Sequence, residues 1–155
     1  MRRFSLFAFA AATFLLVTPT AALAGGGAPF VSTQTTKGSA VIPFSGPCAG
    51  LDGVVTTVFT DVFHITAFAD GHSTIVANQE GSFYFVPTDP LAPTSSGHYR
   101  NGFSDTFENN SGTHTSVFLA VGRDTNGAQV KFKVSTHFTF ANGEVRVDNT
   151  TISCG

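Results

Sequence analysis

The side chains best suited to chemistry in this sequence are polar groups set among aromatic and aliphatic ones. In residues 54–68, Asp61 falls on the same side of an extended chain as apolar neighbours, because alternate side chains of a strand share a face. In residues 98–108, Asn101 and Asp105 alternate with aromatic residues in the same way. A carboxylate in apolar surroundings is costly unless it is paired or hydrogen-bonded, which makes it a candidate general acid or base.

These polar groups and the rings beside them predict a binding site on one buried face. Tyr99, Asn101 and Arg123 are the expected partners of the two carboxylates. The alternative is that a β-bulge turns Asp61 and Asp105 outwards, or that both lie at a rim open to water. The residues predicted to line the site are Phe59, Asp61, Phe63, Tyr99, Asn101, Phe103, Asp105, Phe107 and Phe132.

The sequence contains neither a histidine spacing nor a motif that predicts a metal site or a known catalytic site. The sequence has five histidines, and none lies in a spacing typical of zinc ligands. The motifs of nucleophilic hydrolases, phosphate-binding loops and dinucleotide-binding folds do not occur in it. We therefore expect no cofactor and no metal ion, and whether the protein is an enzyme stays open.

The first residues of the chain predict export. Two arginines precede an apolar run over residues 4–17, and Ala22-Leu23-Ala24 matches the small-residue pattern that signal peptidase recognises. We expect residues 1–24 to be a signal peptide that is cleaved after Ala24. The alternative is a membrane anchor, but the run is shorter than the ~20 residues that span a bilayer. The mature protein is therefore expected to be secreted and free of the membrane.

Composition narrows the class of protein further. The chain of 155 residues has 12% charged residues and a formal net charge of -2, which excludes a basic face for nucleic acid. Its 17 phenylalanines and many β-branched residues are typical of a folded, β-rich protein and not of a disordered chain. Cys48 and Cys154 are its two cysteines. In an exported protein such a pair most simply forms one disulfide, worth about 4–5 kcal/mol in the chain-entropy model.

Strand-like segments follow one another with tight turns between them, and they predict one all-β domain over residues 37–155. Asp70-Gly71 and Asn126-Gly127 are hairpin signals. Long sequential hairpins whose ends are tied together favour a closed up-and-down barrel, and a two-sheet β-sandwich is the alternative. Residues 25–36 are expected to be a flexible N-terminal segment. The expected strands, about eight in number, cover residues 37–44, 54–68, 72–79, 82–86, 98–108, 113–123, 128–140 and 144–154.

Turn positions also predict which residues face each other in the later strands. A turn at Asn126-Gly127 pairs Leu119 with Phe132 and places both on one apolar face. The hairpin before it allows two registers. A β-bulge in its turn brings Phe103 to the face of Leu119, whereas a plain turn pairs Phe103 with Phe118. We prefer the bulge, because it keeps the apolar residues of both strands together.

The stretch from Cys48 to Cys154 resembles a group of uncharacterised exported bacterial proteins. The resemblance is carried by residues 61–66 (DVFHIT), by the final hairpin over residues 137–149 and by the cysteine near each end. In architecture the chain is also similar to the small barrels of the allene oxide cyclase and dirigent type. It departs from lipocalins, whose Gly-x-Trp signature is missing because the sequence has no tryptophan.

Three functions are compatible with these features. The first is a non-catalytic exported barrel that binds a small apolar or amphipathic molecule among its rings. The second is an enzyme of the cyclase or isomerase kind that uses a buried Asp61 or Asp105 with Asn101 or Tyr99. The third is a structural domain of the cell surface with a filled interior. We favour the first, because nothing in the sequence marks a complete catalytic motif.

Overall fold

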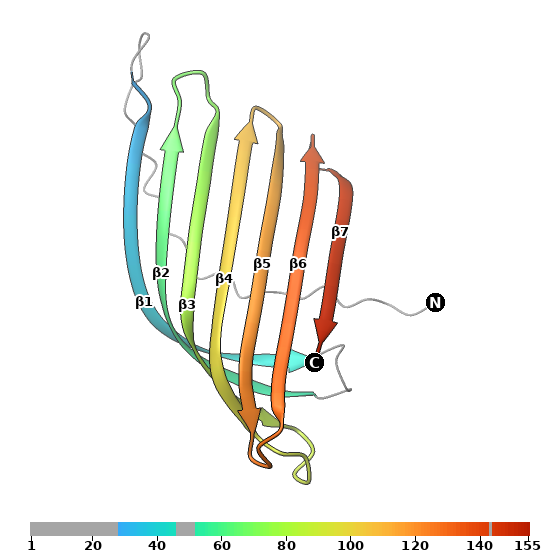
Figure 1. Ribbon diagram of the computed structural model, residues 1–155. Coiled ribbons are helices and arrows are strands. Elements are labelled where there is room, and N and C mark those ends of the chain that lie inside the picture. The colour runs from blue at the N-terminus through green and yellow to red at the C-terminus, as the bar shows by residue number, and fades with distance from the viewer. Residues whose placement is uncertain (1–27, 46–51, 143) are drawn as a thin grey trace.

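The computed structural model describes residues 28–45, 52–142 and 144–155, which form one antiparallel sheet (Figure 1). Each strand pairs with the next along the chain, so the expected all-β, up-and-down topology is confirmed. No helix of these residues is long and apolar enough to cross a membrane. The predicted leader and Cys48 lie outside the described residues. The strands are β1 (Phe30–Ser45), β2 (Asp52–Ala67), β3 (Ser73–Pro87), β4 (Ser95–Glu108), β5 (Ser111–Asp124), β6 (Gln129–Ala141) and β7 (Glu144–Cys154).

The expected closed barrel is not formed by the described strands. β1 and β7 end the strand order of a seven-stranded sheet and are not paired with each other. Neighbouring strands alternate in direction, so the first and last of seven run the same way, and closure would need a parallel pair. An eighth strand would have brought antiparallel edges together. The described strands also form a single sheet, which excludes the two-sheet sandwich for this part of the chain.

The strand count differs from the prediction because residues 72–79 and 82–86 belong to one strand. Gly81 lies inside β3, where it pairs with Phe59 of β2 and Tyr99 of β4. A Cβ atom on Gly81 would lie 2.2 Å from the carbonyl oxygen of Val58 and 2.9 Å from the Tyr99 ring. The glycine is therefore needed for close packing and does not mark a turn. Nearer the N-terminus, β1 begins at Phe30, well before the expected start of the first strand at residue 37.

Ala77 lies between two large rings on the face of the sheet to which Gly81 also belongs. Ala77 of β3 pairs with Phe63 of β2 and with Phe103 of β4, and it is only 2% exposed. The two rings meet over it at an angle of 66°, with their centroids 6.1 Å apart. Because the middle strand carries so little bulk, the rings of the outer two can approach, which bends the sheet towards them.

The sheet curls until its first strand reaches its sixth. The ring of Phe44, near the end of β1, packs edge-on against Phe132 of β6, with the centroids 5.9 Å apart. The same ring packs against Phe85 of β3 at 5.7 Å. In Figure 1, the end of β1 and the start of β2 sweep beneath the other strands towards the C-terminus. We call the face that carries these three rings the concave face, and the opposite one the convex face.

The turn between β5 and β6 sets a register that the sequence did not predict. The carboxylate of Asp124 accepts hydrogen bonds from two backbone N–H groups of the following turn, at 2.9 and 2.8 Å. Asp124 also donates its own N–H to the Ala128 carbonyl at 3.0 Å, so residues 125–127 form the loop. Phe132 consequently pairs with Ala120, and the predicted pairing with Leu119 is wrong.

The turn between β4 and β5 is plain, and the bulge that we preferred is wrong. Asn109 adopts a φ of 52°, a left-handed conformation that asparagine tolerates well. The two-residue turn is Asn109-Asn110, and the ladder continues from it without a shift. Phe103 therefore pairs with Ser116, and the pairing with Phe118 that we expected from a plain turn is also wrong. Phe118 therefore shares the concave face with Phe103, while Leu119 lies on the convex face.

Candidate functional site

The residues predicted to line a site share the concave face. Asp61 of β2, Gln79 of β3 and Asn101 of β4 form one cross-strand row. Paired residues point to the same side of a sheet, and so do alternate residues of a strand. The register therefore excludes the alternative in which a bulge turns the two carboxylates outwards. It places on the concave face Phe59, Asp61 and Phe63 in β2, Tyr99, Asn101, Phe103, Asp105 and Phe107 in β4, and Phe132 in β6.

Asp61 is the least satisfied polar group of this face. Its Oδ1 atom is buried and has no hydrogen-bond partner among the described residues. Phe59 and Phe63 lie on either side of it along β2. A buried polar atom without a partner typically destabilises a fold by about 1–3 kcal/mol. The carboxylate is therefore positioned to accept a hydrogen bond that the described chain does not supply.

Of the expected partners of Asp61, Tyr99 shares its face but makes its hydrogen bond with Thr57, and Arg123 lies on the opposite face. Tyr99 is 6% exposed, and its burial raises the pKa of the phenol above the usual value of 10.0. A hydrogen bond with the Thr57 side chain lowers this pKa in part, and the negative charge of Asp61 raises it. Arg123 lies on the convex face, where its Nη1 donates to the carbonyl oxygen of Gly127 at 2.9 Å.

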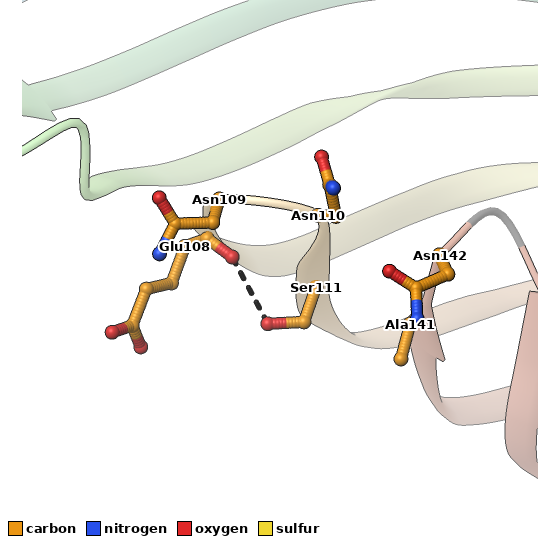
Figure 2. A pocket seen from close by; sticks show the side chains of 6 residues that line it. All are labelled: Glu108, Asn109, Asn110, Ser111, Ala141 and Asn142. Atoms are coloured by element: carbon orange, nitrogen blue, oxygen red, sulfur yellow. Dashed lines mark hydrogen bonds between the residues drawn. The ribbon is translucent and has the colours of Figure 1, made fainter.

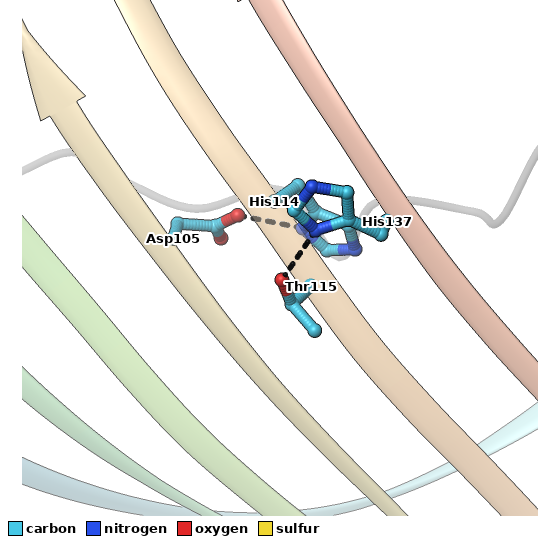
Figure 3. A network of polar contacts seen from close by, with 4 residues as sticks. All are labelled: Asp105, His114, Thr115 and His137. Atoms are coloured by element: carbon cyan, nitrogen blue, oxygen red, sulfur yellow. Dashed lines mark hydrogen bonds and ion pairs between the residues drawn. The ribbon is translucent and has the colours of Figure 1, made fainter. Parts of the chain in front are cut away.

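Asp105 makes a hydrogen bond with His114 that was not predicted from the sequence. The two residues face each other directly across β4 and β5, and Asp105 Oδ1 lies 2.6 Å from His114 Nδ1 (Figure 3). Their side chains are 18% and 22% exposed, so the pair is partly shielded from water. Each residue is visible in the sequence, but their contact depends on the register of one hairpin, which we predicted incorrectly.

The His114 ring is held by aromatic stacking as well as by its hydrogen bond to Asp105. Phe138 of β6 stacks on it with centroids 4.8 Å apart, and Phe103 of β4 lies against it at 6.1 Å. A carboxylate only accepts hydrogen bonds, so Nδ1 of His114 donates to Asp105, and the neutral ring carries its lone pair on Nε2. An imidazole oriented in this way can act as a general base or bind a polar group of a ligand.

The other histidines with a described side-chain hydrogen bond lie on the convex face. His137 of β6 and Thr115 of β5 share a hydrogen bond of 3.0 Å between Nδ1 and the hydroxyl (Figure 3). His64 of β2 makes a similar bond of 3.0 Å with Thr33 of β1. In the described part of the chain, histidines, cysteines and carboxylates form no group that could hold a metal ion.

Two hollows of the surface lie away from these groups. The larger, of about 480 Å³, is formed at one end of the sheet by Glu108–Ser111 and by residues 141–142 (Figure 2). There the Ser111 hydroxyl donates to the carbonyl oxygen of Glu108 at 3.0 Å. The smaller, of about 240 Å³, reaches Asn101 but is lined mainly from the convex face around Gly102. The candidate site is therefore the open concave surface itself.

Comparisons with known proteins add no relative. No family model, no curated protein and no solved structure matches the chain. The expected resemblance to exported bacterial proteins and to small cyclase-type or dirigent-type barrels stays a prediction. The functional argument consequently rests on the side chains of the concave face.

Proposed function

We propose that this protein is an exported binding protein that holds a small amphipathic molecule on its concave face. The observation that carries the proposal is a curved aromatic surface that the described chain does not cover. No large side chain among the described residues is fully buried, and the rings of Phe59, Phe103, Phe107 and Phe132 remain partly exposed. A concave aromatic surface with a few polar groups is typical of sites for small ligands.

The polar groups of this face would orient such a ligand. Asp61 and the Asp105–His114 pair lie two strands and two rows apart, which strand spacings put at roughly 15 Å. Aromatic side chains fill the surface between them, including Phe63 and Phe103. An elongated molecule could thus rest its apolar part on the rings and reach one polar group with its end.

A disulfide between Cys48 and Cys154 belongs to the same proposal, because it would hold the curvature. Phe44 packs against Phe132, and Phe132 pairs with Cys154 in β7. The chain therefore leaves β1 close to the end of β7, and Cys48 follows Ser45 shortly afterwards in the sequence. A covalent bond at this point would tie the curled end of β1 to the last strand.

Native mass spectrometry of the exported protein tests the proposal. The expected species is a monomer without residues 1–24, with its two cysteines oxidised and with a small molecule that is released on denaturation. A dimer that carries nothing would overturn the proposal, because a second copy would then cover the rings. An empty monomer that also fails to bind amphipathic probes would point instead to a structural domain of the cell surface.

A second candidate is an enzyme that moves a proton, and the geometry of Asp105 and His114 favours it. The 2.6 Å contact orients the imidazole as in other carboxylate–histidine pairs that act as bases. The test is to incubate the molecule identified by mass spectrometry with the protein and with the His114→Gln variant. A product formed by the wild type alone supports catalysis. The unchanged molecule recovered from both assigns the protein to binding.

A further inference from the structure

We infer that the concave face selects ligands that carry an ammonium group, and that Asp61 is the residue that holds this group. The inference rests on the proposed binding function and names the chemical class of the ligand. It is drawn from three features of the face: the distribution of charge, the unsatisfied oxygen of Asp61, and the rings that surround this carboxylate.

Lysines and arginines of β1 to β6 are confined to one face of the sheet, whereas carboxylates lie on both faces. Over β1 to β6, Asp61, Asp105 and, at the end of β5, Asp124 lie on the concave side. The lysines and arginines of these strands all lie on the convex face, because each pairs with residues of that face. A cationic ligand is therefore attracted by the concave face and meets no lysine or arginine from these strands, and His114 there is already hydrogen-bonded to Asp105. The convex cations are Lys37, Arg100, Arg123, Lys131 and Lys133.

The carboxylates on the concave side differ in what they can still bind. Asp124 already accepts two backbone hydrogen bonds in its turn. Asp105 already accepts a hydrogen bond from His114 at 2.6 Å, whereas Oδ1 of Asp61 is buried without a partner in the described chain. Such an oxygen needs a donor, and a charged N–H group makes the strongest hydrogen bonds with a carboxylate. A primary ammonium supplies both the donor and the neutralising charge. An alcohol supplies only the donor, and a carboxylate supplies neither.

Aromatic rings surround Asp61 on the concave face. Phe59 and Phe63 precede and follow it on β2, and Tyr99 and Phe103 lie two strands away in β4. The intervening strand carries small residues between these rings, so their faces and edges are not separated by bulky side chains. Aromatic rings within about 6 Å of a cation attract it electrostatically. The rings therefore favour the same charge of ligand as the carboxylate does.

Isothermal titration with three probes of equal chain length tests the inference. The probes are decylammonium, decanoate and decyl maltoside, each below its micelle concentration at pH 7, with the mature disulfide-bonded protein. We expect decylammonium to bind at least about tenfold more tightly than the other two, since its charged hydrogen bond adds to the shared apolar contact. In Asp61→Asn this preference should fall below about threefold.

Glu80→Gln provides the matched control, because it removes one carboxylate from the convex face of β3. This variant should keep the preference for decylammonium. Equal binding of all three probes by the wild type would overturn the inference and leave the proposed function standing. Failure to bind any probe would overturn both. If Asp61→Asn kept the full preference while its circular dichroism matched the wild type, the cation would be held elsewhere and the assignment to Asp61 would be wrong.

Discussion

Replacing Asp61 by asparagine should make the fold more stable, although it removes a native group. The Oδ1 atom of Asp61 is buried without a hydrogen-bond partner among the described residues. Leaving such an atom unsatisfied costs about 1–3 kcal/mol, and more when it carries charge. Asparagine keeps the shape and removes the charge, but its amide still needs partners. We therefore expect about 1 kcal/mol of added stability, a rise in Tm of about 2–4 °C for a domain of this size.

Urea unfolding at pH 7, followed by circular dichroism without ligand, measures this change directly. The control is Glu80→Gln, which should stay within about 0.5 kcal/mol of the wild type because Glu80 is exposed. A loss of 1 kcal/mol or more in Asp61→Asn would refute the reasoning. It would show that the Asp61 carboxylate makes a favourable interaction in the folded protein and does not need a ligand to supply a hydrogen bond.

Three further changes probe the structure around this site. Tyr84 and Tyr99 are the two tyrosines of the chain, so in Tyr84→Phe the absorbance at 295 nm reports on Tyr99 alone. Tyr99 should ionise above pH 10, because burial and the Asp61 charge both raise its pKa. Adding Asp61→Asn should lower the midpoint of this ionisation. As the folded pKa is the higher one, the stability that Tyr99 contributes is complete below about pH 10 and is lost as the pH rises through the raised pKa. Gly81→Ala should lose about 2 kcal/mol or more of stability, since its Cβ would lie 2.2 Å from a backbone oxygen, while Gly102→Ala, with its nearest atom at 3.4 Å, should change little. Reduction of the proposed disulfide should lower the free energy of unfolding by about 4 kcal/mol, and a protein that unfolds identically with and without reductant would contradict the bond.

The all-β topology was predictable because it depends on local signals. Alternation of apolar and polar residues identified the strands, and turns such as Asp70-Gly71 separated them. The predicted strand count was wrong because we placed a break at Gly81, which lies inside β3. The sequence shows the glycine but does not show that the Tyr99 ring packs against it. A glycine in a strand indicates either a break or a close approach, and only the neighbouring strands decide between the two.

The sequence predicted which residues of the site share one face of the sheet, but not which of them contact each other across neighbouring strands. Membership of a face depends only on the parity of positions along one strand, so Asp61 and Asp105 could be assigned together with the rings beside them. The contact between Asp105 and His114 depends on the turn between their strands, and a shift of one residue would have separated them onto opposite faces. Conformations such as that of Asn109, with a φ of 52°, therefore decide which side chains can react together.

The open sheet and the unsatisfied carboxylate are connected. Ala77 and Gly81 let large rings approach one another, so the sheet curls, but seven alternating strands bring edges of the same direction together. The rings consequently line a curved surface and no described strand closes over them. In a closed, filled interior, the oxygen of Asp61 would lack a donor permanently, whereas on an open concave surface a ligand can supply one. The odd number of described strands, which leaves the sheet open, thus also leaves the face that carries Asp61 open to a ligand.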